Sequence, residues 1–130
     1  MQNRNLEKLI PIVSNIIDSK LKAYKEESDK EKKKSLCHIT KKFNGYFASY
    51  GPSILMAGLY QTIYSYANKE KCVNSMILEA MKEMEWIDNS KEDLKDVVKI
   101  GDNIDILLKN RILEIVVACK LAIRTFELEE

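Results

Sequence analysis

Apolar side chains recur at steps of three and four residues along most of the chain, which is the spacing of one face of an α-helix. The first such stretch covers residues 5–26 and contains Pro11, which we expect either in the first turn of the helix or at a kink. A charged run without an apolar member follows at 26–35. It is predicted to be either a mobile loop or the solvated start of a second helix, capped by Ser28 or Asp29.

Glycine and proline punctuate the middle of the chain. The apolar contacts of the second helix are expected to begin at Leu36, and Gly51 suits its C-terminal cap. Pro52 suits the first turn of a third helix, which is predicted over 52–67 and is apolar on most of its faces. Gly58 lies inside this predicted helix, where a glycine usually permits the close approach of another backbone.

Three more helices are predicted in the second half of the chain. The first covers 71–86, and a short helix over 91–99 follows it, with Ser90 as its N-cap. The last helix covers 104–126, with the Asp-Asn pair at 102–103 available as its cap. An acidic, frayed tail is expected after it.

The composition agrees with a helical fold. Of the 130 residues, 45% are hydrophobic and 32% are charged, and there are only four glycines and two prolines. This apolar content suffices for a buried core, whereas a β-sandwich or small barrel needs more turn residues. The sequence therefore predicts a single all-α domain over residues 1–130, built as a compact bundle of five or six helices.

Cysteine usage and the apolar runs bear on the cellular compartment. Cys37, Cys72 and Cys119 form an odd, widely spaced set, which favours free thiols in a reducing compartment over a disulfide framework. Charged residues interrupt the first apolar stretch, so it does not resemble a secretory signal, and no apolar run approaches the length of a membrane span. We expect a cytoplasmic protein without membrane association.

The residues that catalysis would need are few. The single histidine, His38, is adjacent to Cys37, and neighbours on a helix point about 100° apart, which disfavours a shared metal site or a thiolate–imidazole pair. There is no glycine-rich phosphate loop and no zinc-protease motif. We therefore predict no catalytic residue, metal ligand or cofactor. An enzyme using Cys37 and His38 is the alternative, and it requires a thiol that alkylating reagents modify quickly.

Charge is unevenly distributed along the chain, although the net charge is only +1. Residues 1–50 carry 11 basic and 6 acidic side chains, and residues 51–130 carry 10 basic and 14 acidic side chains. The two parts therefore have net charges of +5 and −4. Such an asymmetry favours the attraction of a polyanion or head-to-tail self-association.

A cluster of lysines precedes several aromatic residues. Lysine neutralises phosphate without reading base sequence, and exposed aromatic rings stack on bases. Spacing allows Lys34, Lys41 and Lys42 to share one broad helical face. The alternative, which spacing alone favours, is a solvated face of mixed charge with core aromatics at 43, 46, 47 and 50. The candidate phosphate contacts are Lys33, Lys34, Lys41 and Lys42.

Tyrosines gather on the predicted third helix at positions 60, 64 and 66. An ordinary core helix with hydroxyl groups at its rim accounts for them. The alternative is a seam between proteins, where tyrosine is enriched, and for that role Tyr60 and Tyr64 are the candidate subunit contacts.

The segment 46–66 resembles the helix–Pro–helix signature of a known family, the small α-helical subunit of the type III-B (Cmr) CRISPR effector complex. The segment covers about a sixth of the chain and departs from the family pattern at Ala57, where relatives often carry a polar residue, and at Tyr64, where they tend to carry Phe. The matching positions are Tyr46, Tyr50, Pro52, Gly58, Leu59, Gln61 and Tyr64.

The resemblance implies a non-catalytic structural subunit of an antiviral ribonucleoprotein. Such subunits stack into a short filament beside other CRISPR effector subunits and help hold the duplex of guide RNA and target RNA, while neighbouring subunits cleave. The small subunit of the type III-A (Csm) complex has a similar role and is an alternative. A second alternative is a protein–protein adaptor bundle without RNA binding, which would bind a partner helix through methionines. These are Met56, Met76, Met81 and Met84.

Overall fold

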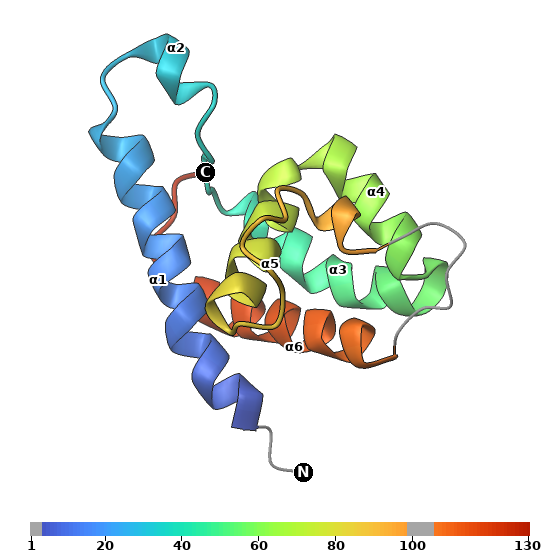
Figure 1. Ribbon diagram of the computed structural model, residues 1–130. Coiled ribbons are helices and arrows are strands. Elements are labelled where there is room, and N and C mark those ends of the chain that lie inside the picture. Colours follow the sequence, from blue (N-terminus) through green and yellow to red (C-terminus); the bar gives the residue numbers. More distant parts are fainter. Residues whose placement is uncertain (1–3, 99–105) are drawn as a thin grey trace.

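Helices make up the regular structure throughout residues 4–98 and 106–130, the two ranges that the computed structural model describes (Figure 1). These ranges contain six α-helices and one 3-10 turn and no strand, so the prediction of an all-α bundle is confirmed. The elements are α1 (Arg4–Glu26), α2 (Lys30–Lys33), α3 (Lys42–Ala57), α4 (Leu59–Lys69), α5 (Lys71–Glu83), η1 (Leu94–Asp96) and α6 (Ile106–Ile123).

The long C-terminal helix organises the core. Helix α6 packs most extensively against α1 and also contacts α3 and α5, while α4 packs against α3, α5 and η1. In Figure 1, α3 and α6 lie side by side, and α1 crosses α6 near the C-terminal end of α6. Large, fully buried side chains come from the segment before α3 and from α1, α3, α4, α5 and α6, which contributes Ile112 and Ile115. The largest of those outside α6 are Leu9, Ile17, Ile39, Phe43, Phe47, Tyr50, Ile54, Leu59, Ile63, Met76, Ile77 and Met81.

Helix α1 forms as its apolar spacing predicts. Leu9, Val13 and Ile17 lie one turn apart and are fully buried, so a single stripe attaches α1 to the bundle. Pro11 lies inside the helix and not in its first turn. Proline has no N–H for the carbonyl group of Glu7, but Pro11 is on the exposed side, where water can bind that carbonyl.

The predicted helix boundary at Gly51 and Pro52 is wrong. Helix α3 continues through both residues, and the chain breaks instead at Gly58, whose φ of 97° is in the region that favours glycine. There the Gly58 N–H donates to the Ile54 carbonyl, and the Thr62 N–H donates to the Gly58 carbonyl. No atom lies within 4 Å of a Cβ built on Gly58, so backbone conformation and not close approach explains this glycine.

The predicted second helix also begins later than its apolar residues suggest. Leu36 and Ile39 lie outside any helix, and α3 starts only at Lys42. The charged run yields only the single turn of α2, where Lys30 and Lys34 place like charges one turn apart. Ile39 is nonetheless buried, so the connection into α3 is anchored by its own side chain.

Acidic side chains cap the short elements. Asp29 caps α2, as predicted, by accepting a hydrogen bond from the Glu31 N–H at 2.9 Å. The short helix predicted over 91–99 is reduced to the turn η1, which Asp93 caps by accepting from the Lys95 N–H. Ser90, the predicted cap, instead donates its N–H to Asp88.

The ends of α5 and α6 fall short of their predicted positions. Helix α5 ends three residues before Trp86, and Glu85 between them has a φ of 59° that terminates the helix. Helix α6 ends at Ile123, and the residues after it continue as a non-helical tail. The predicted cap at 102–103 lies outside the described residues.

A small polar network joins three helices inside the core. The Tyr50 hydroxyl donates to Asn74 Oδ1 at 2.8 Å, and Asn74 Nδ2 donates to the Ile63 carbonyl at 2.8 Å. Nearby, the hydroxyl groups of Ser53 and Thr62 lie 2.8 Å apart. Because buried polar groups are costly without partners, these bonds fix the relative register of α3, α4 and α5.

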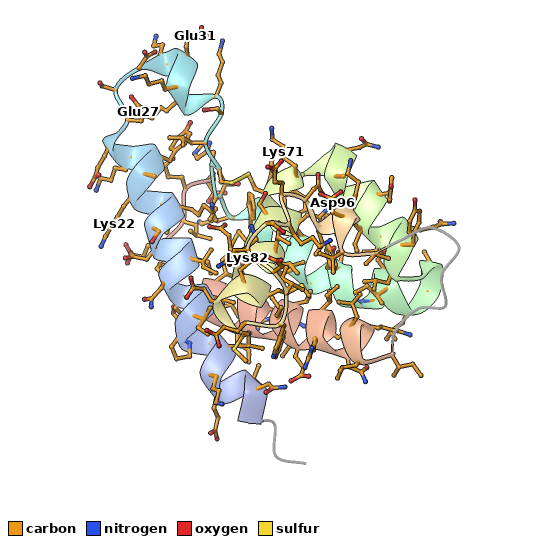
Figure 2. All side chains as sticks on the ribbon, viewed as in Figure 1. Lys22, Glu27, Glu31, Lys71, Lys82 and Asp96 are labelled. Carbon is orange, nitrogen blue, oxygen red and sulfur yellow. A yellow bond between two sulfur atoms is a disulfide. The ribbon has the colours of Figure 1, made fainter. Side chains whose placement is uncertain are left out.

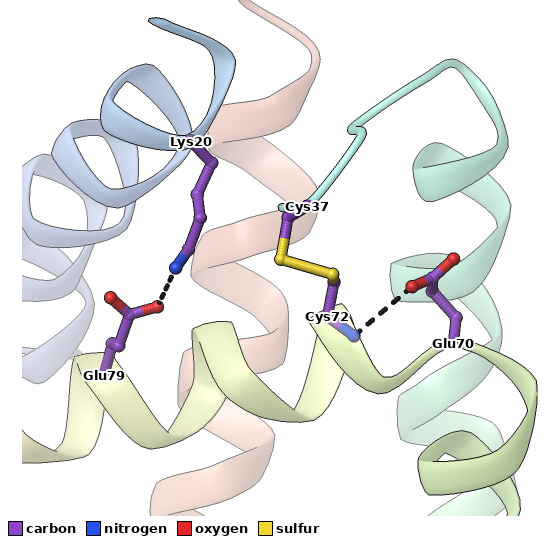
Figure 3. Close-up of a disulfide and its surroundings, with 5 residues drawn as sticks. All are labelled: Lys20, Cys37, Glu70, Cys72 and Glu79. Atoms are coloured by element: carbon purple, nitrogen blue, oxygen red, sulfur yellow. Dashed lines mark hydrogen bonds and ion pairs between the residues drawn. A yellow bond between two sulfur atoms is a disulfide. The ribbon is translucent and has the colours of Figure 1, made fainter. Parts of the chain in front are cut away.

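The prediction of three free thiols is wrong for two of them. Cys37 and Cys72 form a disulfide with their Cα atoms 5.8 Å apart, and only Cys119 is free and buried (Figure 3). The two residues are 35 positions apart, and the fold brings the connection before α3 onto the first turn of α5. No feature of their spacing indicates this contact.

Candidate nucleic-acid interface

The connection between α1 and α3 projects from the bundle and carries most of the clustered lysines. We call residues 27–41 the basic loop; Figure 1 shows it beyond the end of α1, and Figure 2 shows Glu31 at its outer end and Glu27 where it leaves α1. No side chain over 27–37 is buried, so its charges lie in water. Its lysines are Lys30, Lys32, Lys33, Lys34 and Lys41.

Two of the candidate lysines lie at the α2 end of this loop. Lys33 Nζ lies 4.7 Å from the centre of the Tyr24 ring in a cation–π contact. Lys34 Nζ lies 3.3 Å from Glu31 Oε1 in an exposed ion pair. Both ammonium groups are therefore engaged by neighbours, but in contacts that water reaches.

The other two candidates lie where the chain enters α3, so the predicted single helical face is wrong. Lys41 Nζ forms an ion pair with Glu130 Oε1 at 2.6 Å. Lys42 is exposed and has no ion pair with any residue that the structure describes. Because Lys34 follows α2 and Lys42 begins α3, the non-helical connection between them separates the two pairs of lysines.

The acidic tail, residues 124–130, is held against the basic loop and is not frayed as predicted. The Lys41 N–H donates to the Glu129 carbonyl at 2.9 Å, and His38 Nε2 lies 3.3 Å from Glu129 Oε2. Together with the Glu130 ion pair, these contacts place two carboxylates beside Lys41 and His38. The tail thus puts negative charge where the sequence places a phosphate contact.

A surface ring stack was not predicted from the sequence. The rings of Tyr24 and His38 are stacked with centres 4.0 Å apart and planes 4° from parallel. Lys33 contacts the same tyrosine ring, so one aromatic side chain connects α1 to both halves of the basic loop. These residues are too far apart in sequence for helical spacing to associate them.

The aromatic residues after the lysines belong to the core, as the alternative interpretation predicted. Phe43, Phe47 and Tyr50 are buried and cannot stack on bases. Tyr66 is also buried and donates its hydroxyl to the Tyr46 carbonyl at 3.2 Å. Burial raises the pKa of the hydroxyl groups of Tyr50 and Tyr66 above the ordinary value.

Tyr60 and Tyr64, the candidate subunit contacts, are adjacent on α4. Their rings are stacked with centres 4.5 Å apart, and Tyr64 is 39% exposed. Lys95 Nζ lies 5.5 Å from the centre of the Tyr64 ring. Partial removal from water, and then the neighbouring Tyr64 hydroxyl, raise the pKa of Tyr60 to about 12. The structure brings these two tyrosines together and leaves Tyr66 in the core.

The methionine surface that an adaptor would use is largely absent. Met76 and Met81 are fully buried and belong to the core, so their assignment to a partner surface is wrong. Met84 is half-buried, whereas Met56 is 90% exposed and follows the exposed Leu55 at the end of α3. Of these four methionines, Met56 is therefore the one that presents most of its side chain to a partner.

The groups that could support catalysis are sparse in the described parts of the chain. Within residues 4–98 and 106–130, no three His, Cys, Asp or Glu side chains gather closely enough to hold a metal ion. Cys37 is in a disulfide and has no thiol, and burial raises the pKa of the Cys119 thiol. Over the same residues, none of the helices has the length and apolar content to span a membrane.

Comparison with known proteins adds no family assignment. No family model matches the chain, and no curated protein or solved structure shows significant similarity to it. Function is therefore inferred from the residues and the geometry described above.

Proposed function

We propose that this protein is a non-catalytic, RNA-contacting structural subunit of a type III-B CRISPR ribonucleoprotein. In this role the basic loop lies along the phosphate backbone of the guide RNA–target RNA duplex. The observation that carries the proposal is a water-exposed loop that projects clustered lysines away from the bundle. The resemblance of segment 46–66 to the small subunit of that complex supports the same role, although Pro52 lies within α3 and the helix boundary is at Gly58.

Lysines suit this kind of recognition. An ammonium group neutralises phosphate without reading bases, which is sufficient where base pairing supplies sequence specificity. The carboxylate partners of Lys34 and Lys41 do not prevent it, because both ion pairs are exposed and such pairs contribute only about 0.2–1 kcal/mol. A phosphate can therefore replace Glu31 or Glu130 at small cost.

Assembly with other subunits uses a different surface in this proposal. The stacked pair of Tyr60 and Tyr64 offers rigid aromatic area on α4 for contact with neighbouring effector subunits. Head-to-tail self-association is compatible with the opposite charges of the two parts of the chain, because a filament needs a heterologous contact. The proposed place of action is the cytoplasm.

A salt titration of RNA binding tests the proposal. The double variant Lys34→Gln plus Lys42→Gln removes two exposed charges at opposite ends of the proposed interface. Each lost phosphate contact lowers the slope of log affinity against log salt by about 0.7–0.9, so we expect a slope smaller by about 1.5. The matched control, Lys8→Gln plus Lys82→Gln, removes the same charge at residues outside both the basic loop and the start of α3.

Equal slopes for the double variant and the wild type would refute the assigned interface. A control variant that weakens binding as much as the double variant would show non-specific attraction to the net charge instead. Melting temperatures of all three proteins should agree, since no altered side chain is buried.

The adaptor alternative is favoured by one observation, the exposed Leu55 and Met56 at the end of α3. An adaptor without RNA binding would show negligible affinity for RNA even at low salt. That result would leave the apolar pair as the better candidate for the functional surface.

A further inference from the structure

The Cys37–Cys72 disulfide joins a weakly held loop to a well-packed helix. Cys37 lies in the basic loop and is partly exposed, whereas Cys72 is in the first turn of α5 and is buried (Figure 3). The hydrogen bonds seen within 27–37 join residues of the loop to one another and not to the bundle. The disulfide is therefore the strong attachment of this stretch to the core.

The disulfide also lies in a surface cavity with basic side chains. The cavity has a volume of about 520 Å³, and its lining includes both cysteines together with Lys20, Lys71 and Glu79. Figure 3 shows Lys20 on α1 reaching Glu79 on α5, with Nζ and Oε2 2.8 Å apart. A small thiol reagent can thus approach the sulfur atoms without unfolding of the bundle.

We propose that Cys37–Cys72 is a reversible redox-modification site whose co-reactant is a dithiol, and that it latches the basic loop onto α5. The thiolate of the dithiol attacks Sγ of Cys37, the less buried of the two residues, and the bond to Cys72 breaks. The second thiol of the reagent then displaces Cys37. The reagent is oxidised to its own disulfide, and Cys37 and Cys72 each end as a thiol that has gained one proton.

The location of Cys72 favours its departure as a thiolate in the first step. It lies in the first turn of α5, a helix of 13 residues, where the helix dipole stabilises negative charge. Lys71 precedes it and Lys20 lines the same cavity. Glu70, whose carboxylate accepts from the Cys72 N–H at 3.3 Å, partly offsets this stabilisation.

Reduction should free only part of the loop. Beyond Cys37, Ile39 is buried and Lys41 bonds to Glu129 and Glu130, so residues 38–41 stay attached. The stretch 27–37 loses its link to α5 and keeps mainly local contacts and the Lys33–Tyr24 contact. The release of the stretch 27–37 does not depend on the proposed function. An effect of reduction on RNA binding does depend on it, and is expected because the lysines within 30–34 would become mobile.

Hydrogen exchange on the full chain, before and after treatment with a dithiol such as dithiothreitol under native conditions, tests the latch. We expect exchange at least about tenfold faster over 27–37 and in the first turn of α5 after reduction, with α3 and α6 unchanged. Mass analysis after alkylation should count two additional reactive thiols. The Cys119→Ala variant, which introduces no polar group into the core, should show the same change on reduction as the wild type, and Cys37→Ser should match the reduced protein.

Three other results would overturn the latch. Resistance of the disulfide until global unfolding, or unfolding of the whole bundle on reduction, would make it a structural cross-link. Reduction without faster exchange over 27–37 would show that other contacts hold the loop. A difference in RNA affinity between the oxidised and reduced protein would connect the latch to the proposed function. If exchange changes as expected but RNA affinity does not, only that connection is refuted and the latch stands.

Discussion

The Asn74 side chain offers the sharpest test of how the core is held together. Asn74 is 4% exposed and lies in the middle of a short chain of hydrogen bonds, accepting from the Tyr50 hydroxyl and donating to the Ile63 carbonyl. In Asn74→Ala both of these groups lose their partner. Leaving a buried polar group unsatisfied costs about 1–3 kcal/mol, so the two together amount to about 2–6 kcal/mol.

A nearby cavity narrows this range. A cavity of about 160 Å³ borders Asn74 between α5 and η1, and water that enters it can bond to the orphaned groups. We therefore expect Asn74→Ala to lower the free energy of unfolding by about 2–4 kcal/mol, a large part of the total stability of a typical domain. Urea unfolding followed by circular dichroism measures the difference.

The pairing itself is tested by a double-mutant cycle. Tyr50→Phe removes the hydroxyl group and leaves one oxygen of Asn74 without its donor, whereas in the double variant neither group remains. The double variant should therefore be more stable than the sum of the single effects predicts, by about 1–2 kcal/mol. The control Ser75→Ala changes an exposed neighbour on the same helix and should stay within about 0.5 kcal/mol of the wild type. Strict additivity of the two core changes would refute the coupling.

Two further predictions concern charge and pH. The double variant Glu129→Gln plus Glu130→Gln removes the carboxylates beside Lys41 and His38. RNA binding at low salt, measured by fluorescence anisotropy, should tighten by up to about fivefold. Unchanged affinity would mean that the tail does not compete with RNA. At alkaline pH, the raised pKa values of the buried tyrosines and of Tyr60, at about 12, mean that the unfolded chain releases these protons first, near pH 10. Stability should be full below pH 10 and should fall as the pH rises toward 12, together with a delayed tyrosinate absorbance; tyrosines that all titrate near pH 10 in the folded protein would contradict this.

Local spacing was sufficient to predict the helical content and much less of where helices end. The stripe of Leu9, Val13 and Ile17 is an unambiguous helical period, so α1 is readily predicted. The predicted boundary is wrong because Gly51-Pro52 is a typical end of one helix and start of the next, whereas Pro52 lies inside α3 and the helix ends at Gly58. The position of the helix end depends on the tertiary packing of α3 along α6, which a local sequence pattern does not contain.

In the candidate interface, too, local features can be predicted from the sequence and long-range contacts cannot. The lysine cluster and the burial of the following aromatics can be predicted from local composition. The carboxylate partners of His38 and Lys41 cannot be predicted in this way, because Glu129 and Glu130 lie 91 and 89 positions away from them. The Cys37–Cys72 contact is hidden for the same reason, since it joins two elements that only the assembled bundle brings together.

Long-range charge contacts also change what the uneven charge distribution means. The sequence places a net positive charge in residues 1–50 and a net negative charge in residues 51–130, which favours two opposed faces. In the structure the acidic tail instead folds back onto the basic loop, so part of the asymmetry is neutralised within one molecule. A second copy and an RNA backbone would then compete with the same tail for Lys41. Lys42 has no ion pair among the described residues, so a second copy or an RNA backbone can bind it without displacing a carboxylate.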